Sequence, residues 1–141
     1  MISGDRSQIR QFIAAAWRKH RQGAPLEPIE QIIAAVVARH PEYHALLEAP
    51  PPALAEDFPE ASGQENPFLH LGLHIALSEQ LNADRPPGIT GLFGRLSSRL
   101  GDPHRAEHGM LECLGRIMWQ AGQDGRMPDE QAYLDCVRRL L

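Results

Sequence analysis

Six of the seven histidines fall into pairs whose members are four residues apart in the sequence. The pairs are His40/His44, His70/His74 and His104/His108. Residues four apart share one face of an α-helix, separated by about 6 Å along its axis. Two imidazoles placed in this way can bind the same metal ion. The spacing therefore predicts metal-ligating histidines wherever these segments are helical.

Carboxylates continue two of these histidine pairs at the same four-residue spacing, and we call each such row of residues a stripe. Glu48 follows His44 by four residues, and Glu112 follows His108 by four. Glu79 lies one residue beyond the equivalent position after His74 and is a reserve candidate. The predicted ligands are therefore His40, His44, Glu48, His70, His74, His104, His108 and Glu112. We also expect Tyr43 to line the site.

The third stripe also reads as His104-x-x-Glu107-His108, the inverted form of the zinc-protease signature. In that motif Glu107 is the candidate general base between two histidine ligands. Such enzymes take a third, carboxylate ligand from far downstream on a larger fold, and here only 33 residues follow His108. Glu107 also lies about 100° around a helix from His108. The protease interpretation therefore ranks behind a site built from all three stripes.

Helical periodicity dominates the chain, and strand signals are almost absent. Asn66-Pro67 and Asp102-Pro103 are start signals that combine a capping side chain with proline at the first helical position. Pro41 marks a boundary at His40, because the residue before a proline disfavours helical backbone. The segment 50–66 reads as a loop. The expected helices lie near 5–21, 28–40, 41–49, 67–81, 89–100, 103–122 and 128–141.

These patterns predict an all-α fold, a bundle of about six helices in a single domain over residues 1–141. The net charge of −4 gives no reason to expect nucleic-acid binding. No segment has the roughly 18 consecutive apolar residues of a membrane span. Cys113 and Cys136 lie far apart and form no Cys-x-x-Cys motif, so we expect reduced thiols in a cytoplasmic protein.

The number of ligands indicates more than one metal ion. The segments expected to be helical supply five histidines and two carboxylates, His44, Glu48, His70, His74, His104, His108 and Glu112. That is too many for one tetrahedral zinc and enough for two ions. Imidazole with carboxylate suits iron, manganese or zinc.

The stripes His-x-x-x-Glu, His-x-x-x-His and His-x-x-x-His-x-x-x-Glu over residues 40–112 resemble the ligand pattern of hemerythrin-like proteins. That resemblance implies a helical bundle with a di-iron centre that binds or senses O₂. Over nearly its whole length the chain also resembles a small proteobacterial family of uncharacterised function. The segments that carry this second resemblance are "HPEYH", "NPFLHLGLHIALSEQL", "HRAEHGMLECL" and "PDEQAYL".

Three functions remain open on the sequence. The first is a metal-binding bundle with two iron ions and a redox- or oxygen-linked role. The second is a zinc-dependent hydrolase that uses the same histidines, with Glu107 or Glu112 as the base. The third is a non-catalytic interaction module, in which the basic first helix and the proline-rich loop dock a partner and the histidines are structural.

Overall fold

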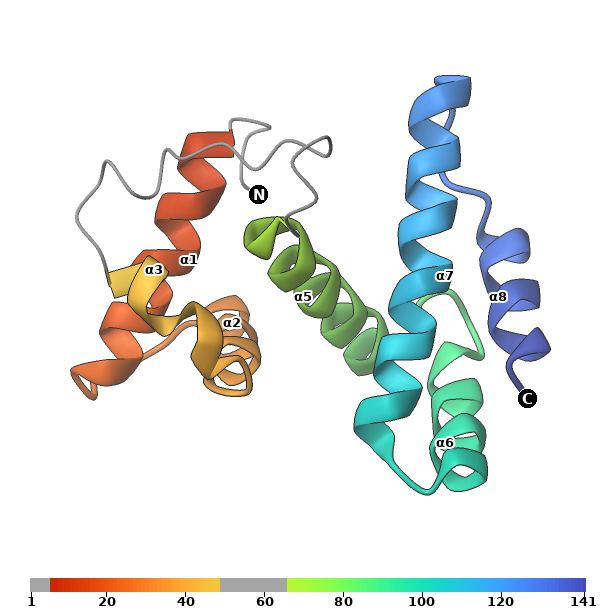
Figure 1. The fold of residues 1–141 in the computed structure, drawn as a ribbon, viewed down its shortest axis with the longest axis horizontal. Helices are drawn as coiled ribbons and strands as arrows, with labels where there is room; N and C mark the ends of the chain where they lie inside the picture. The colour runs from red at the N-terminus through yellow and green to blue at the C-terminus, as the bar shows by residue number, and fades with distance from the viewer. Residues whose placement is uncertain (1–5, 49–65) are drawn as a thin grey trace. The chain divides into compact units, whose positions relative to one another are not determined.

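A computed structural model describes residues 6–48 and 66–141, and every regular element in these two ranges is helical, as the sequence predicts (Figure 1). The predicted loop lies outside the described residues except for Asn66. The elements are α1 (Arg6–Arg21), α2 (Pro28–Ala38), the 3₁₀ turn η1 (Pro41–Tyr43), α3 (His44–Glu48), α5 (Pro67–Ala83), α6 (Ile89–Leu100), α7 (Pro103–Asp124) and α8 (Glu130–Arg139). The all-α prediction is confirmed.

The chain divides into two compact units, Met1–Ile75 and Ala76–Leu141, and the boundary falls inside α5. The first unit holds α1 to α3 and the first half of α5. The second unit holds the remainder of α5 with α6, α7 and α8. The expectation of one domain over 1–141 stays a prediction.

The helices of the first unit start where local signals place them. The side chain of Glu27 and that of Glu30 form a capping box at the start of α2, with Pro28 at its first position. Asn66 caps α5, because its side-chain oxygen accepts hydrogen bonds from the backbone N–H groups of Phe68 and Leu69. These bonds satisfy donors that have no partner within the helix.

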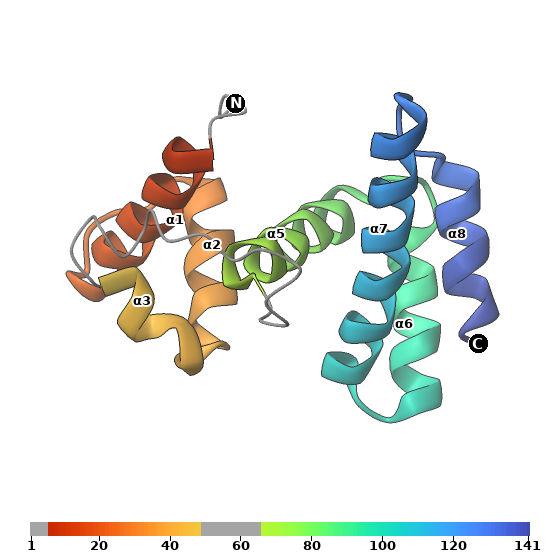
Figure 2. The ribbon, with the colours of Figure 1, turned by 45° about the horizontal axis from the view of Figure 1, so that its top comes forward.

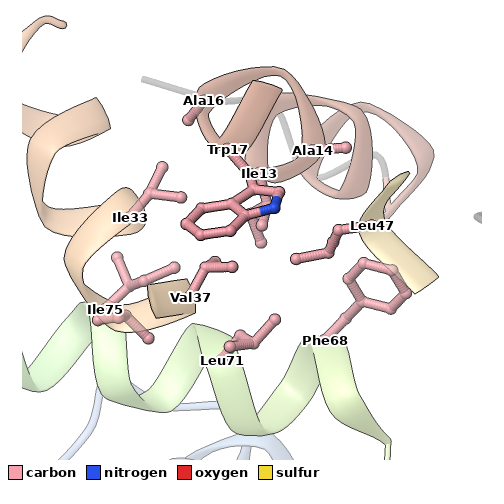
Figure 3. Close-up of a cluster of buried hydrophobic side chains, with 11 residues drawn as sticks. Ile13, Ala14, Ala16, Trp17, Ile33, Val37, Leu47, Phe68, Leu71 and Ile75 are labelled. Atoms are coloured by element: carbon pink, nitrogen blue, oxygen red, sulfur yellow. The ribbon is translucent and has the colours of Figure 1, made fainter. Parts of the chain in front are cut away.

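Trp17 lies in the hydrophobic core of the first unit, which draws on all four helical segments (Figure 3). The apolar stripe of α1 packs against α2, α3 and the start of α5. The core residues are Ile13, Ala14, Ala16, Trp17, Ile33, Val36, Val37, Leu47, Phe68, Leu71 and Ile75. This core fixes the end of α2 against α5, which brings residues distant in the sequence close together.

In the second unit, α6, α7 and α8 lie side by side, with α7 antiparallel to both neighbours (Figures 1 and 2). Asp102 caps α7 as predicted, since its side chain accepts from the backbone N–H of His104 at 3.0 Å. Gly101 ends α6 with φ of 71°, a left-handed conformation that favours glycine. This turn reverses the chain between the two helices.

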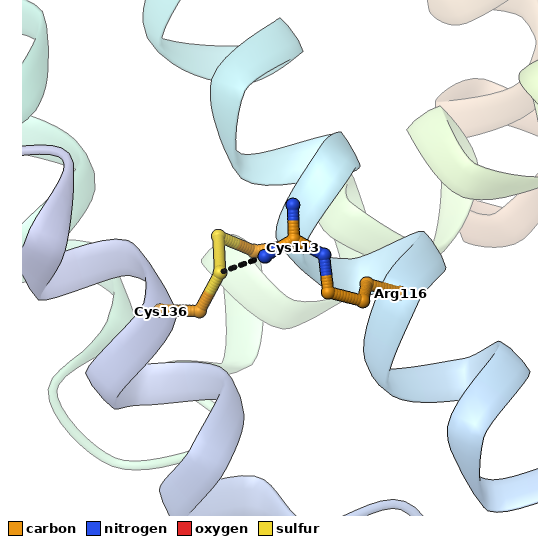
Figure 4. The surroundings of a disulfide bond; sticks show 3 residues. All are labelled: Cys113, Arg116 and Cys136. Carbon is orange, nitrogen blue, oxygen red and sulfur yellow. Dashed lines mark hydrogen bonds between the residues drawn. A yellow bond between two sulfur atoms is a disulfide. The ribbon is translucent and has the colours of Figure 1, made fainter.

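Cys113 of α7 and Cys136 of α8 form a disulfide (Figure 4). The expectation of reduced thiols is therefore wrong. The antiparallel packing of α7 against α8 brings the two Cα atoms to 5.8 Å, a typical separation for a disulfide. The cytoplasmic location loses the support of this cysteine argument and stays a prediction.

Asp84 organises the start of α6. Its Oδ1 accepts hydrogen bonds from the backbone N–H groups of Thr90 at 3.0 Å and Gly88 at 3.2 Å. These bonds hold the pKa of Asp84 below its ordinary value, with the Thr90 bond the largest cause. Because the pKa of Asp84 is lower in the folded than in the unfolded chain, its ionised carboxylate stabilises the fold at any pH above the unfolded pKa. This stabilisation is lost as the pH falls through the folded pKa.

We therefore expect Asp84→Asn to lower the Tm at pH 7. Asparagine keeps an acceptor and tolerates the φ of 50° at this position, so mainly the charge is lost. The Tm difference between variant and wild type should narrow as the pH falls below about 3.9. Thermal melts followed by circular dichroism check this, and a difference independent of pH would contradict it.

Candidate metal centre

Three histidines of the first unit are brought together by the end of α2 and the start of α5. His40 lies two residues beyond Ala38, the last residue of α2, and has non-helical backbone, as its position before Pro41 predicts. His70 and His74 lie one turn apart on α5. We call His40, His70 and His74 the histidine triad.

The ring nitrogens of the triad lie within 4.8 Å of one another. The Nε2 atoms of His70 and His74 are 3.1 Å apart and form a hydrogen bond, in which one of them donates to the other. The His40 ring centroid lies 4.5 Å from that of His74 and 5.1 Å from that of His70. His40 is 3% exposed and His74 is fully buried, while His70 is half-buried. Buried imidazoles need hydrogen-bond partners or a bound ion.

A backbone carbonyl sets the tautomer of His40. The His40 Nδ1 lies 2.7 Å from the carbonyl oxygen of Val36. Since a carbonyl can only accept, Nδ1 carries the ring proton and donates a hydrogen bond. The lone pair is then on Nε2. Histidine metal ligands typically donate their second ring N–H to such an acceptor, which orients the ring and raises its basicity.

One pair of nitrogens in the triad has the spacing of two ligands on a transition-metal ion. With metal–nitrogen distances of about 2.0–2.1 Å, two nitrogens of a tetrahedral site lie about 3.3 Å apart. The 3.1 Å between the Nε2 atoms of His70 and His74 is close to that value. Three imidazoles suit zinc, copper, iron or nickel, and they leave a coordination position open.

Tyr43 lies beside the triad, as the sequence predicts. Its ring stacks on His40 with centroids 5.8 Å apart, and it meets His70 edge-on at 6.2 Å. The phenol ring therefore forms part of the wall around the histidines.

The structure does not bring His44 and Glu48 to the triad. The Nε2 of His44 donates to the Val37 carbonyl at 2.8 Å, and its ring packs on Trp17 at 4.5 Å. The Glu48 carboxylate accepts from Trp17 Nε1 at 2.9 Å and from Arg21 at 3.0 Å. His40 precedes the 3₁₀ turn and α3 begins only at His44, so the four-residue spacing of His40 and His44 does not place them on one helix face.

We expect Glu48→Gln to leave the affinity for metal unchanged within about twofold, because the carboxylate contacts Trp17 and Arg21 and not the triad. Isothermal titration with Zn²⁺ measures this. A tenfold loss would show that Glu48 is a ligand after all.

The remaining candidates lie in the second unit. The rings of His104 and His108 on α7 have centroids 4.2 Å apart and are nearly perpendicular. His104 and Glu112 are exposed, whereas Glu107 is buried. Glu79, at the second-unit end of α5, is exposed. That any of these residues joins the triad stays a prediction from the sequence.

Two basic residues of α1, Arg10 and Lys19, have partners within the first unit. The Arg10 guanidinium is buried and lies 4.6 Å from the centre of the Phe68 ring. Lys19 donates to Glu30 at 2.8 Å, and this bond is the main reason that the pKa of Glu30 lies below its ordinary value. That α1 docks a partner through its basic face stays a prediction from the sequence.

Fold and site together define an all-helical protein with a largely buried histidine triad that could bind a transition-metal ion. The chain belongs to the family described as a domain of unknown function, DUF1841, whose model matches residues 5–139. The resemblance to an uncharacterised family is thus confirmed, while the resemblance to hemerythrin-like proteins is not. No curated protein and no solved structure matches the chain. In the described ranges, no helix has both the length and the apolar character needed to cross a membrane.

Proposed function

We propose that this protein binds a transition-metal ion through the Nε2 atoms of His40, His70 and His74. The observation that carries the proposal is the convergence of the three ring nitrogens within 4.8 Å in a largely buried setting. The bond between His40 Nδ1 and the Val36 carbonyl supports it, because that bond directs the other nitrogen of the ring outward as a ligand.

The donor set narrows the choice of metal. Among the described residues of the first unit, the clustered donors are all imidazoles. Magnesium and calcium prefer oxygen ligands, whereas zinc, iron, copper and nickel accept imidazole nitrogen. An ion held by three protein ligands also has room for water or another small molecule, as in catalytic zinc sites.

The dinuclear iron form of the proposal needs more than the triad. It requires ligands from α7, namely His104, His108 and Glu112, because Glu48 is bound to Trp17 and Arg21. The di-iron centre, its redox- or oxygen-linked role and manganese as a further candidate metal stay predictions from the sequence. A di-iron centre predicts two iron ions per chain and absorption in the near-ultraviolet or visible range, whereas a zinc hydrolase would be colourless.

Metal content tests the proposal. We expect untagged protein, purified without chelators, to hold at least about one transition-metal ion per chain by plasma mass spectrometry. The His74→Ala variant should lose this metal, and the His20→Ala variant should keep it, since His20 is exposed on α1 and stacks on Trp17. Metal-free wild-type protein that takes up no zinc or iron on titration would overturn the proposal.

A further inference from the structure

The second unit has a hollow of about 650 Å³ that is unrelated to the histidine triad. Its walls come from α7, through Leu114, Ile117 and Met118, and from the segment entering α8, through Met127. Tyr133 of α8 also lines it and donates from its hydroxyl to Gln80 Oε1 at 2.7 Å. The lining is therefore mainly apolar, and its polar pair Tyr133 and Gln80 is joined by a hydrogen bond.

This hollow continues into a smaller one of about 180 Å³, and the two share Ile117, Met127 and Asp129. We call the combined depression the α7/α8 groove. Its α7 wall reaches from Leu114 to Asp124, which corresponds to about 15 Å of helix. An open groove three helical turns long suits a helix better than a compact small molecule.

Large apolar side chains are exposed along the groove. Met127 is 87% exposed and Met118 is 47% exposed, and the neighbouring Trp119 is 59% exposed. Methionine and tryptophan are enriched at protein interfaces, and methionine adapts its shape to an incoming partner. Met118 and Met127 line the groove, and Trp119 follows Met118 in the sequence, so this part of the chain offers a surface for an apolar partner face.

The rim of the groove is acidic. Asp124, Asp129 and Glu130 line it, against the single cation of Arg126. Asp124 accepts a hydrogen bond from the Gln120 side chain, and the Asp129 side chain caps α8. An occupant with lysine or arginine beside its apolar face would complement this rim.

The disulfide ties the two walls together. Cys113 precedes Leu114 on α7, and Cys136 lies one turn after Tyr133 on α8. A groove with fixed walls loses less conformational entropy when a partner binds.

We propose that the α7/α8 groove binds a basic amphipathic helix from a partner protein. The helix lays its apolar face against Ile117, Met118 and Met127, and its cationic side chains reach Asp129 and Glu130. A second copy of this chain is a poor source of such a helix. Its own basic helix, α1, already buries its apolar stripe in the core of the first unit.

Peptide titration of the full-length oxidised protein tests this proposal. The probes are two 14-residue amphipathic peptides of matched apolar face, one built from Leu and Lys and the other from Leu and Glu. We expect calorimetry to show at least about tenfold tighter binding of the Leu/Lys peptide, and 0.5 M salt to reduce the difference.

Matched variants locate the binding surface. Met127→Lys should weaken the binding of the Leu/Lys peptide by about tenfold or more, because the new lysine repels the cationic peptide and an apolar contact is lost. Leu69→Lys, at a site on α5 that is 61% exposed, should leave the affinity unchanged. Both sites are exposed, so the variants should fold. Equal binding of the two peptides, no binding of either, or concentration-dependent dimerisation blocked by Met127→Lys would each overturn the proposal.

Discussion

Replacing His74 with alanine lowers the affinity for Zn²⁺ by more than about 100-fold in our account. Loss of a group that only orients a ligand already costs about 10- to 100-fold, so loss of a ligand itself should cost more. His74 is fully buried, and its Nε2 lies 3.1 Å from that of His70. Competitive titration against a chromogenic chelator measures the affinity.

A structural role for the histidines predicts a different result. In that case His74→Ala would lower the Tm of metal-free protein and leave metal binding as weak as in wild type. His70→Ala provides a second variant, at a half-buried position that is better able to tolerate the change. His20→Ala is the matched control, because His20 is an exposed histidine of the same unit. If His20→Ala lost as much affinity as His70→Ala, the ligand assignment would be wrong.

Removing the disulfide lowers the free energy of unfolding of the second unit by about 3 kcal/mol in the chain-entropy model. The bond between Cys113 and Cys136 spans 23 residues, and its loss restores the conformational entropy of that loop in the unfolded chain. Urea denaturation of the Cys113→Ser/Cys136→Ser variant measures the change. Trp119 fluorescence reports on the second unit, in a Trp17→Phe background that removes the signal of the first unit.

Reductant supplies the control for this prediction. Wild-type protein with excess dithiothreitol should unfold at the same urea concentration as the double variant, since both lack the cross-link. If reductant left the wild-type midpoint unchanged, the cysteines would already be thiols in the purified protein. The assignment of the disulfide would then fail.

Local sequence signals predict the helices well. Asn66 before Pro67 and Asp102 before Pro103 each place a side-chain acceptor next to unpaired backbone N–H groups, and both hydrogen-bonded caps form. The proximity of His70 and His74 also follows from sequence, because residues four apart in one helix must share a face. These features depend only on neighbouring residues.

Features that depend on tertiary packing could not be predicted from the sequence. Pro41 interrupts the helical path after His40, so the four-residue spacing does not bring His44 and Glu48 to the face on which His40 lies. The spacing of Cys113 and Cys136 does not show that α7 packs antiparallel to α8. The role of the Val36 carbonyl in orienting His40 could not be predicted either, because every residue type has a backbone carbonyl.

The central claim is that the three imidazoles of the triad are metal ligands. Two-dimensional ¹H–¹⁵N spectra of the imidazole groups follow every histidine during Zn²⁺ titration. Our account predicts that the Nε2 resonances of His40, His70 and His74 shift together and saturate at one ion per triad, while those of His20 and His44 stay in place. Unchanged triad resonances at saturating zinc, with the protein folded, would contradict the account.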